Sequence, residues 1–388
     1  MKSAAAVFLL AIVVMISARI SPTVAAELRS TGGLAVVIER TTGSVLIVER
    51  GSRQVLDRVE GFGDLSHASV VFSADARFAF VFGRDGGLTK LDLLTGEIVG
   101  RVIQAGNSIG GAISDDGALV AVANYEPGGV RVFDAETLEP VADFDTGAKT
   151  IGLVEAPGRR FVFTTWDTAE TWIADMSAPE PSVTIVPDIG ANPYDALLSP
   201  DGRTYIAGLF GEDGLTMLDL WEEKPTPRRI LPGYGRGEEP LPVYKMPHLE
   251  GWARAGGRFV LPAIGRHEVL WVDAASFEEV ARTETHGQPV FAVARPGGRQ
   301  VWVNFAHPRN DTIQVVDTVT GEIVKTLKPG PAVLHMEFAP RGDEVWVSVR
   351  DEDKVRVYDA ETFAITGEIA AGTPSGIFFT ARAHRIGL

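Results

Sequence analysis

The chain has 388 residues, a formal net charge of −15 and no cysteine. The acidic balance excludes nucleic acid or an anionic membrane surface as the preferred partner, because such partners bind through clustered cations. Without a thiol, the chain cannot form a disulfide, a thiolate metal site or a lipid linkage through cysteine.

The first 26 residues have the composition of an export signal. Lys2 gives a small positive region, residues 4–18 form an apolar stretch, and residues 24–26 are suited to cleavage. The apolar stretch is short for a membrane span and ends at Arg19, although an uncleaved anchor is the alternative. We expect a signal peptide at 1–26, a periplasmic mature chain from about Glu27, and no integral membrane segment in it. Removing Lys2 and Arg19 changes the net charge from −15 to −17.

One pattern then recurs along the chain: an alternating hydrophobic run, an acidic residue, a turn, a second run and usually a glycine. It is clearest at 88–106, 130–147, 312–330 and 354–372. The acidic markers are spaced by 43, 42, 41, 44, 54, 44 and 42 residues, and they are Glu49, Asp92, Asp134, Asp175, Asp219, Asp273, Asp317 and Asp359. Strand-like repeats of this period are typical of a β-propeller. We predict an all-β protein whose residues 27–388 form an eight-bladed β-propeller of four-stranded blades.

The second repeat shows the expected strands of a blade at 69–73, 78–83, 88–93 and 98–103, with turn residues between them. At the end of the chain, the run 376–380 has no strands after it. At the beginning, the runs 34–39 and 45–49 have no first strand before them. We therefore expect the N- and C-terminal strands to pair within one blade and close the ring.

The antiparallel strand order assigns the loops to two faces. Loops from first to second and from third to fourth strand, such as 73–77, share one face and read as tight turns. Loops from second to third strand, and passages between blades, share the other face. Most histidines and several arginines fall in or beside this second class: His67, His248, His267, His286, His307, His335, Arg84, Arg236, Arg266, Arg309 and Arg350. We predict that this face carries the functional site.

The interval of 54 residues between Asp219 and Asp273 is about ten residues longer than its neighbours. The surplus falls most naturally at 233–247, which is rich in glycine, proline and charge. We expect this segment to cover part of the same face as a lid.

The histidines and arginines suggest the chemistry of that face. His67 lies at a passage between blades near the axis, where it is a candidate axial iron ligand, a general base or a hydrogen-bonded loop residue. His335 and His248 hold corresponding positions in two other blades and are candidate catalytic groups, with packing and loop hydrogen bonding as alternatives. The five arginines favour a ligand with several carboxylates, because arginine pairs with carboxylates bidentately and stays charged.

Other motifs give weaker indications. Residues 106–110 match the Gly-x-Ser-x-Gly elbow around Ser108, but that motif needs a strand-to-helix turn and strands are expected on both sides. The glycine runs 61–66 and 233–238 lack the dinucleotide-binding spacing. A hydrolase that uses Ser108 is therefore a third hypothesis, and a nicotinamide site is not expected.

Residues 66–93, SHASVVFSADARFAFVFGRDGGLTKLDL, resemble the d1-heme domain of cytochrome cd-type nitrite reductases. From about residue 30 to residue 388 the chain is still more similar to the NirF family of heme d1 biogenesis proteins. The motifs that carry this similarity include NYEPGGV, AGLFGEDGL, YGRGEEPLPVYKMPHLEGW and VWVNFAHPRNDT.

The resemblance implies a periplasmic protein of denitrification that binds heme d1, or a late iron tetrapyrrole precursor, in a late maturation step. It implies that His67 binds the iron, that Arg84 contacts the carboxylates, and that His248 lies near the other side of the macrocycle. The chain lacks the Cys-x-x-Cys-His motif of an electron-input domain, which argues against reductase activity. Redox modification of the macrocycle and non-catalytic delivery remain the two alternatives, with nitrite reductase and other heme d1 biogenesis proteins as partners.

Overall fold

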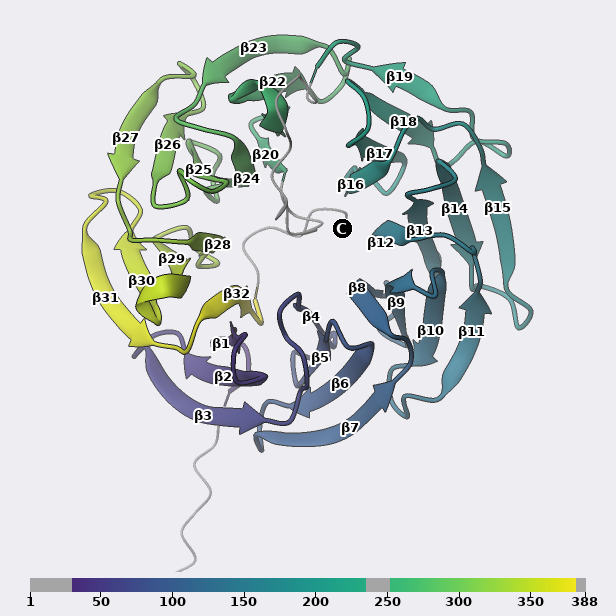
Figure 1. Ribbon diagram of the computed structural model, residues 1–388, viewed down its shortest axis with the longest axis horizontal. Helices are drawn as coiled ribbons and strands as arrows, with labels where there is room; N and C mark the ends of the chain where they lie inside the picture. Colours follow the sequence, from purple (N-terminus) through teal and green to yellow (C-terminus); the bar gives the residue numbers. More distant parts are fainter. Residues whose placement is uncertain (1–29, 235–251, 382–388) are drawn as a thin grey trace, which may run out of the picture.

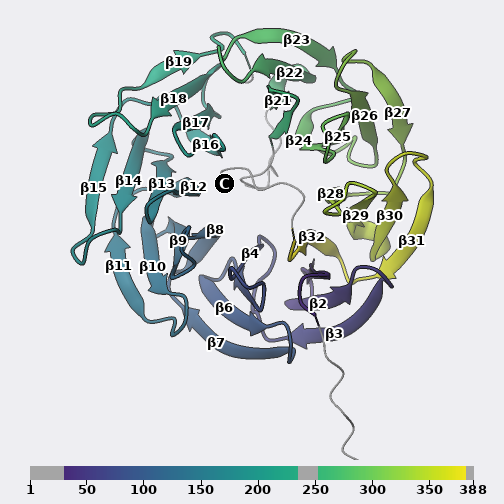
Figure 2. The same ribbon diagram turned by 180° about the vertical axis from the view of Figure 1, so that it is seen from behind.

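The computed structural model describes residues 30–234 and 252–381. Its strands form eight four-stranded antiparallel sheets that follow one another around a ring (Figure 1). Seen from behind, each sheet again runs from the axis to the rim (Figure 2). The predicted eight-bladed β-propeller is confirmed. The expected signal peptide at 1–26 lies outside the described residues. Within the two described ranges, no helix has the length and apolarity needed to cross a membrane.

We number the blades in chain order and give their strands from the axis outward. Blade 1 contains β32 (Pro374–Phe379), β1 (Leu34–Glu39), β2 (Ser44–Glu49) and β3 (Gln54–Glu60), and blade 2 contains β4 (Ser69–Phe72), β5 (Phe78–Phe82), β6 (Gly87–Asp92) and β7 (Glu97–Ile103). Blade 3 contains β8 (Asn107–Ile113), β9 (Leu119–Glu126), β10 (Val130–Asp134) and β11 (Pro140–Phe144), and blade 4 contains β12 (Thr150–Ala156), β13 (Arg160–Thr165), β14 (Glu170–Asp175) and β15 (Ser182–Val186). Blade 5 contains β16 (Pro193–Leu198), β17 (Thr204–Leu209), β18 (Leu215–Asp219) and β19 (Arg228–Ile230), and blade 6 contains β20 (Ala253–Ala255), β21 (Arg258–Ala263), β22 (Glu268–Asp273) and β23 (Glu279–Glu284). Blade 7 contains β24 (Pro289–Ala294), β25 (Gln300–Phe305), β26 (Ile313–Asp317) and β27 (Ile323–Leu327), and blade 8 contains β28 (Val333–Phe338), β29 (Glu344–Val349), β30 (Lys354–Asp359) and β31 (Ile365–Ala370). The 3-10 helices η1 (Ile264–Arg266) and η2 (Arg350–Glu352) lie in loops of blades 6 and 8.

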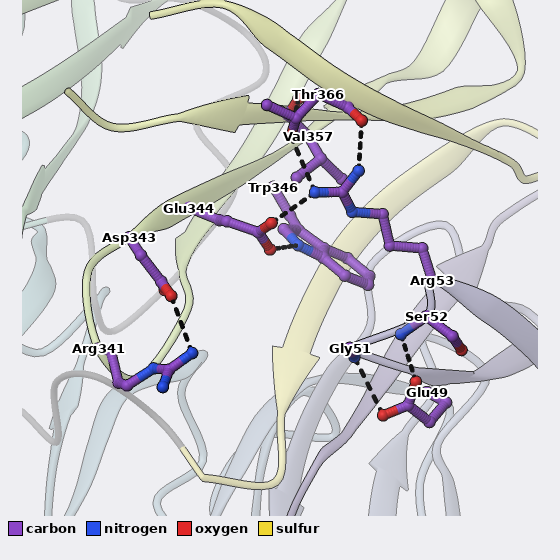
Figure 3. Close-up of polar contacts among 10 residues, drawn as sticks. All are labelled: Glu49, Gly51, Ser52, Arg53, Arg341, Asp343, Glu344, Trp346, Val357 and Thr366. Atoms are coloured by element: carbon purple, nitrogen blue, oxygen red, sulfur yellow. Dashed lines mark hydrogen bonds and ion pairs between the residues drawn. The ribbon is translucent and has the colours of Figure 1, made fainter. Parts of the chain in front are cut away.

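Blade 1 joins the two ends of the chain, as predicted. β1 pairs with β2 on one side and with β32 on the other. On the turn side of the joint between blades 8 and 1, Arg53 forms an ion pair with Glu344 at 2.5 Å and donates to the Thr366 hydroxyl at 2.9 Å (Figure 3). Beside them, the Trp346 and Phe379 rings pack edge to face, with centroids 5.1 Å apart. The ring is therefore closed by backbone pairing, apolar packing and an ion pair.

The core lies between neighbouring blades rather than within any one of them. All six residues of β1 and of β6 are buried because adjacent blades cover both sheet faces, whereas the outermost strands β3 and β31 are mainly exposed. Strand ends in the second blade match the sequence prediction to within one residue. The alternation of apolar residues thus locates each strand, and contacts between blades determine how deeply it is buried.

The acidic markers have a structural role at the turn from third to fourth strand. Each marker is the last residue of a third strand. Its carboxylate accepts hydrogen bonds from backbone N–H groups that follow it, for example from Thr137 to Asp134 at 2.8 Å and from Thr362 to Asp359 at 2.7 Å. This side-chain-capped turn explains why an acidic residue marks every repeat.

Because of these turns, we expect the folded chain to lose stability in acid. Backbone N–H donors are the main cause that lowers the pKa of Asp134, Asp317 and Asp359 below the ordinary value. A folded-state pKa below the unfolded one stabilises the fold at higher pH, and this stabilisation is lost as pH falls through the folded pKa. We expect the contribution of these turns to the melting temperature to be level from about pH 7 to about pH 5 and to be lost below about pH 4, near the unfolded pKa of aspartate.

The matched control is the triple variant Asp134→Asn, Asp317→Asn and Asp359→Asn. An asparagine oxygen still accepts the turn hydrogen bonds but does not titrate. The variant should therefore show a shallower acid transition in scanning calorimetry than the unaltered chain. Equal acid sensitivity of the two proteins would contradict the assignment.

Candidate functional site

The two faces of the ring differ as the loop assignment predicts. The turn face carries tight turns in which the hydroxyls of Ser73, Ser114 and Ser199 donate to an aspartate two residues later. The other side, which we call the loop face, carries the second-to-third loops and the passages between blades. It includes residues 40–43, 61–68, 83–86, 166–169, 187–192, 210–214, 264–267, 306–312 and 350–353.

His67 lies on the loop face, in the passage from β3 to β4. Nη1 of Arg84 is 2.5 Å from Nδ1 of His67. Since a guanidinium only donates, Nδ1 accepts, and the proton of the neutral ring is on Nε2. Burial, together with the positive charges of Arg84 and Arg40, lowers the pKa of His67 to about 4. The imidazole is therefore neutral at pH 7.

The passage that carries His67 is held by short-range contacts. The backbone N–H of Arg84 donates to the carbonyl of Asp64, and that of Ser66 donates to the Asp64 carboxylate, both at 2.8 Å. Gly63 adopts a φ of +79°, and a Cβ there would overlap the Asp85 carboxylate. A glycine is required at this position, and the passage has a defined conformation.

Three arginines occupy equivalent positions just after the second strand of consecutive blades: Arg350 in blade 8, Arg40 in blade 1 and Arg84 in blade 2. Arg40 is absent from the sequence prediction. Burial lowers the pKa of Arg40, and the charges of Arg350 and Arg84 lower it further, so Arg40 lies near a cation of each neighbouring blade. Arg350 is also paired with Asp351 at 2.6 Å. Burial acts to raise the pKa of Asp64, but hydrogen bonds from Ser66 and the two cations Arg84 and Arg40 keep it below the ordinary value. Such a cluster would be stabilised by an anion with several carboxylates.

Among residues 30–234 and 252–381, three buried polar atoms without a hydrogen-bond partner lie at the loop-face ends of first strands. They are Oγ of Ser375 on β32, Oγ of Ser69 on β4 and Oδ1 of Asn107 on β8. Leaving such an atom without a hydrogen bond costs about 1–3 kcal/mol. The neutral imidazole and the cations of the loop face suit a polar ligand over blades 8, 1 and 2.

His335 has a different environment. It is 5% exposed, and its Nδ1 accepts a hydrogen bond from the backbone N–H of Ile377 at 3.1 Å. Its ring stacks on Phe378, with centroids 5.5 Å apart. His335 therefore links β28 of blade 8 to β32 of blade 1 at the ring closure. Its catalytic role stays a prediction.

Arg266 and Arg309 lie on the loops of blades 6 and 7, away from His67 in the order of the ring. Arg266 pairs with Asp213 of blade 5 at 3.2 Å, and Arg309 donates to the carbonyl of His286. Burial, and then the charge of Arg309, lower the pKa of His286. The structure thus places Arg84 beside His67 and Arg350 near Arg40, and it places Arg266 and Arg309 in a second arc.

Ser108 is part of a buried hydrogen-bond network. Its hydroxyl accepts from Gln104 at 2.7 Å and donates to Asn124 at 2.8 Å, and it is 1% exposed. It lies within β8, so the residues around it form a strand and not the turn that a nucleophile elbow requires. A structural role accounts for Ser108.

Arg236, His248 and residues 235–247 of the predicted lid lie outside the described residues. Within 30–234 and 252–381, no group of three or more His, Cys, Asp or Glu side chains is placed to hold a metal ion.

Comparisons with known proteins show the family of the chain. The family model described as "Cytochrome D1 heme domain" matches residues 29–383. The chain is 56% identical over 370 residues to Protein NirF of Stutzerimonas stutzeri, covering 93% of this chain and 95% of that protein. It is 57% identical over 370 residues to Protein NirF of Pseudomonas aeruginosa, covering 93% and 94%. The solved structure titled "Dihydro-heme d1 dehydrogenase NirN in complex with DHE" has a TM-score of 0.80 at 25% identity, covering 92% of this chain and 77% of that chain.

Proposed function

Because this chain belongs to the NirF family, within the wider family of the cytochrome D1 heme domain, and has a role in heme d1 biosynthesis, we propose that it binds heme d1 or a late precursor on its loop face. It then takes part in a late maturation step. The observation that carries the proposal is a neutral His67 beside the cations Arg84 and Arg40, with Arg350 near Arg40. A neutral imidazole suits iron, and the guanidinium groups suit carboxylates.

The contact between His67 and Arg84 couples these two roles. To bind iron through Nε2, His67 has to move its proton from Nε2 to Nδ1, and Arg84 then has to leave Nδ1. A ligand carboxylate is a stronger partner for Arg84 than a neutral ring nitrogen. When Arg84 binds a carboxylate, it therefore releases Nδ1 of His67. If the macrocycle lacks that carboxylate, Arg84 stays on Nδ1, the proton stays on Nε2, and His67 is not free to bind the iron.

Redox modification of the macrocycle is the favoured step, because a solved structure with the same fold is named a dihydro-heme d1 dehydrogenase. A dehydrogenation would pass an electron pair to a separate acceptor and release protons, for which His248 and His335 are the candidate acceptors. The alternative is a carrier that binds the macrocycle unchanged. In both cases the chain acts in the periplasm and supplies cytochrome cd-type nitrite reductase, with other heme d1 biogenesis proteins as further partners.

The test is incubation of the purified chain with a late precursor, with and without ferricyanide as electron acceptor. Binding should change the absorption spectrum of the macrocycle, and oxidation should lower its mass by a pair of hydrogen atoms only when chain and acceptor are both present. A retained spectral change with unchanged mass would favour the carrier. No spectral change would contradict the proposed function altogether.

A further inference from the structure

The turn face holds a pocket at the joint between blades 5 and 6, which are neighbours in the ring (Figure 1). Its volume is about 520 Å³, within the roughly 300–1,000 Å³ range of small-molecule sites. Residues from the turns 199–203 and 274–277 form its rim, and its apolar lining includes Met217, Phe259 and Phe277. The pocket lies on the face opposite to the proposed macrocycle site, so the proposed function does not account for it.

The joint between blades 7 and 8 shows what can fill the equivalent space. There the Trp302 side chain is fully buried. The centroid of its ring lies 5.9 Å from that of Phe338, 6.1 Å from that of Tyr358 and 6.0 Å from that of Phe363. Its Nε1 donates to Oε1 of Gln300 at 3.2 Å, so the indole extends along β25 toward the turn face. The space between two blades thus accommodates an aromatic ring at this depth.

Three of these four rings are replaced at the joint between blades 5 and 6. Trp302 and Ile206 each pair with the residue two places before the acidic marker of their blade, so Ile206 is the equivalent of Trp302. The same register gives the other correspondences, which are Phe338 with Arg254, Tyr358 with Val272, and Phe363 with Phe277. The pocket therefore lies where an indole and a phenol ring are missing. One phenyl ring remains on its wall, and a guanidinium takes the place of another.

Arg254 lines the pocket and is exposed, and no ion pair joins it to a carboxylate within 30–234 and 252–381. The two lining carboxylates already have donors. Asp219 accepts from Nε and Nη2 of Arg203 at 2.8 and 2.6 Å. Asp201 accepts from the hydroxyl of Ser199 at 2.5 Å. An anionic ligand would therefore meet Arg254 without displacing an existing ion pair.

We infer that this pocket binds a small aromatic carboxylate, whose ring lies against Met217 and Phe277 and whose carboxylate pairs with Arg254. A planar ring suits the site because phenyl and guanidinium groups both stack on aromatic rings. The carboxylate suits it because arginine pairs with carboxylates bidentately. The inference is independent of the proposed function, since the two sites lie on opposite faces of the ring.

The probe is indole-3-acetate, titrated into the full chain by isothermal calorimetry. A ligand of this size should bind with a dissociation constant below about 1 mM. Arg254→Gln should weaken its binding roughly tenfold, the scale of one hydrogen bond to a charged group, and should leave the affinity for neutral indole unchanged. The matched control is Arg299→Gln, which changes an exposed arginine in a turn of blade 7 and should keep the affinity for both probes.

Ile206→Trp tests the ring-sized space itself, because it supplies the side chain that Trp302 provides in the other joint. This variant should bind neither indole-3-acetate nor indole, and its melting temperature should not fall. Should Ile206→Trp not fold, the comparison of the two probes on Arg254→Gln decides the question. The inference is wrong if the unaltered chain binds no indole-3-acetate at several millimolar. It is equally wrong if Arg254→Gln or folded Ile206→Trp binds indole-3-acetate with the affinity of the unaltered chain.

Discussion

His67→Ala is expected to weaken binding of an iron tetrapyrrole by at least about 100-fold, since even residues that only support a metal ligand cost 10–100-fold when changed. The variant removes the neutral imidazole that Arg84 contacts at 2.5 Å and leaves the arginines in place. The absorption bands that report an axial nitrogen ligand should disappear with it. Titration of the variant with heme d1, followed by its absorption spectrum, measures both effects.

Two controls separate iron binding from loss of local structure. A metal-free tetrapyrrole with the same carboxylates should bind His67→Ala at least as tightly as the unaltered chain, because it has no iron for His67 and Arg84 no longer has to leave His67. His286→Ala changes a loop-face histidine of the other arc and should leave the spectrum unchanged. Full retention of the heme d1 spectrum and affinity by His67→Ala would remove His67 as the iron ligand.

Phe379→Ala is expected to cause the largest loss of stability of any single variant considered, about 3–5 kcal/mol of unfolding free energy. Phe379 has no exposed surface, pairs through its backbone with Ala35, and packs against Trp346 of the last blade. Its removal leaves a cavity at the only joint where the chain ends close the ring. Urea unfolding followed by tryptophan fluorescence measures the loss, with Trp346 reporting from the joint itself.

The matched control is Val319→Ala, because Val319 is 82% exposed in a turn. Its effect should stay within about 0.5 kcal/mol, as for surface substitutions in general. A second variant, Arg53→Ala, removes the ion pair with Glu344 at the same joint and should fall between the two. A loss below about 1 kcal/mol for Phe379→Ala would mean that the ring does not depend on this joint.

The fold could be predicted almost completely because its repeat has a local cause. Each marker carboxylate, such as Asp134 or Asp359, accepts hydrogen bonds within its own turn, so sequence and structure are linked over a few residues. The antiparallel order then assigns every loop to a face without further information. Less predictable were the three-residue strands β19 and β20, which are shorter than the other described strands.

The site was predicted less completely because its properties depend on distant contacts. Arg40 was not predicted because blade 1 is divided between the two ends of the chain. Its loop, residues 40–43, does not belong to a complete repeat in the sequence. The burial of His335 depends on Ile377 and Phe378, which belong to the next blade. The neutral state of His67 depends on burial and on Arg84 and Arg40 together. No local pattern reports such neighbours.

The equivalent positions of Arg350, Arg40 and Arg84 have an evolutionary consequence. Each arginine lies in a loop that joins two paired strands. The backbone hydrogen bonds between those strands do not depend on the side chain in the loop. Substitutions can therefore transfer a cation to the neighbouring blade without altering the core. Moving a cation to the equivalent position of the next blade would shift it by about one eighth of a revolution around the axis, since the ring has eight blades.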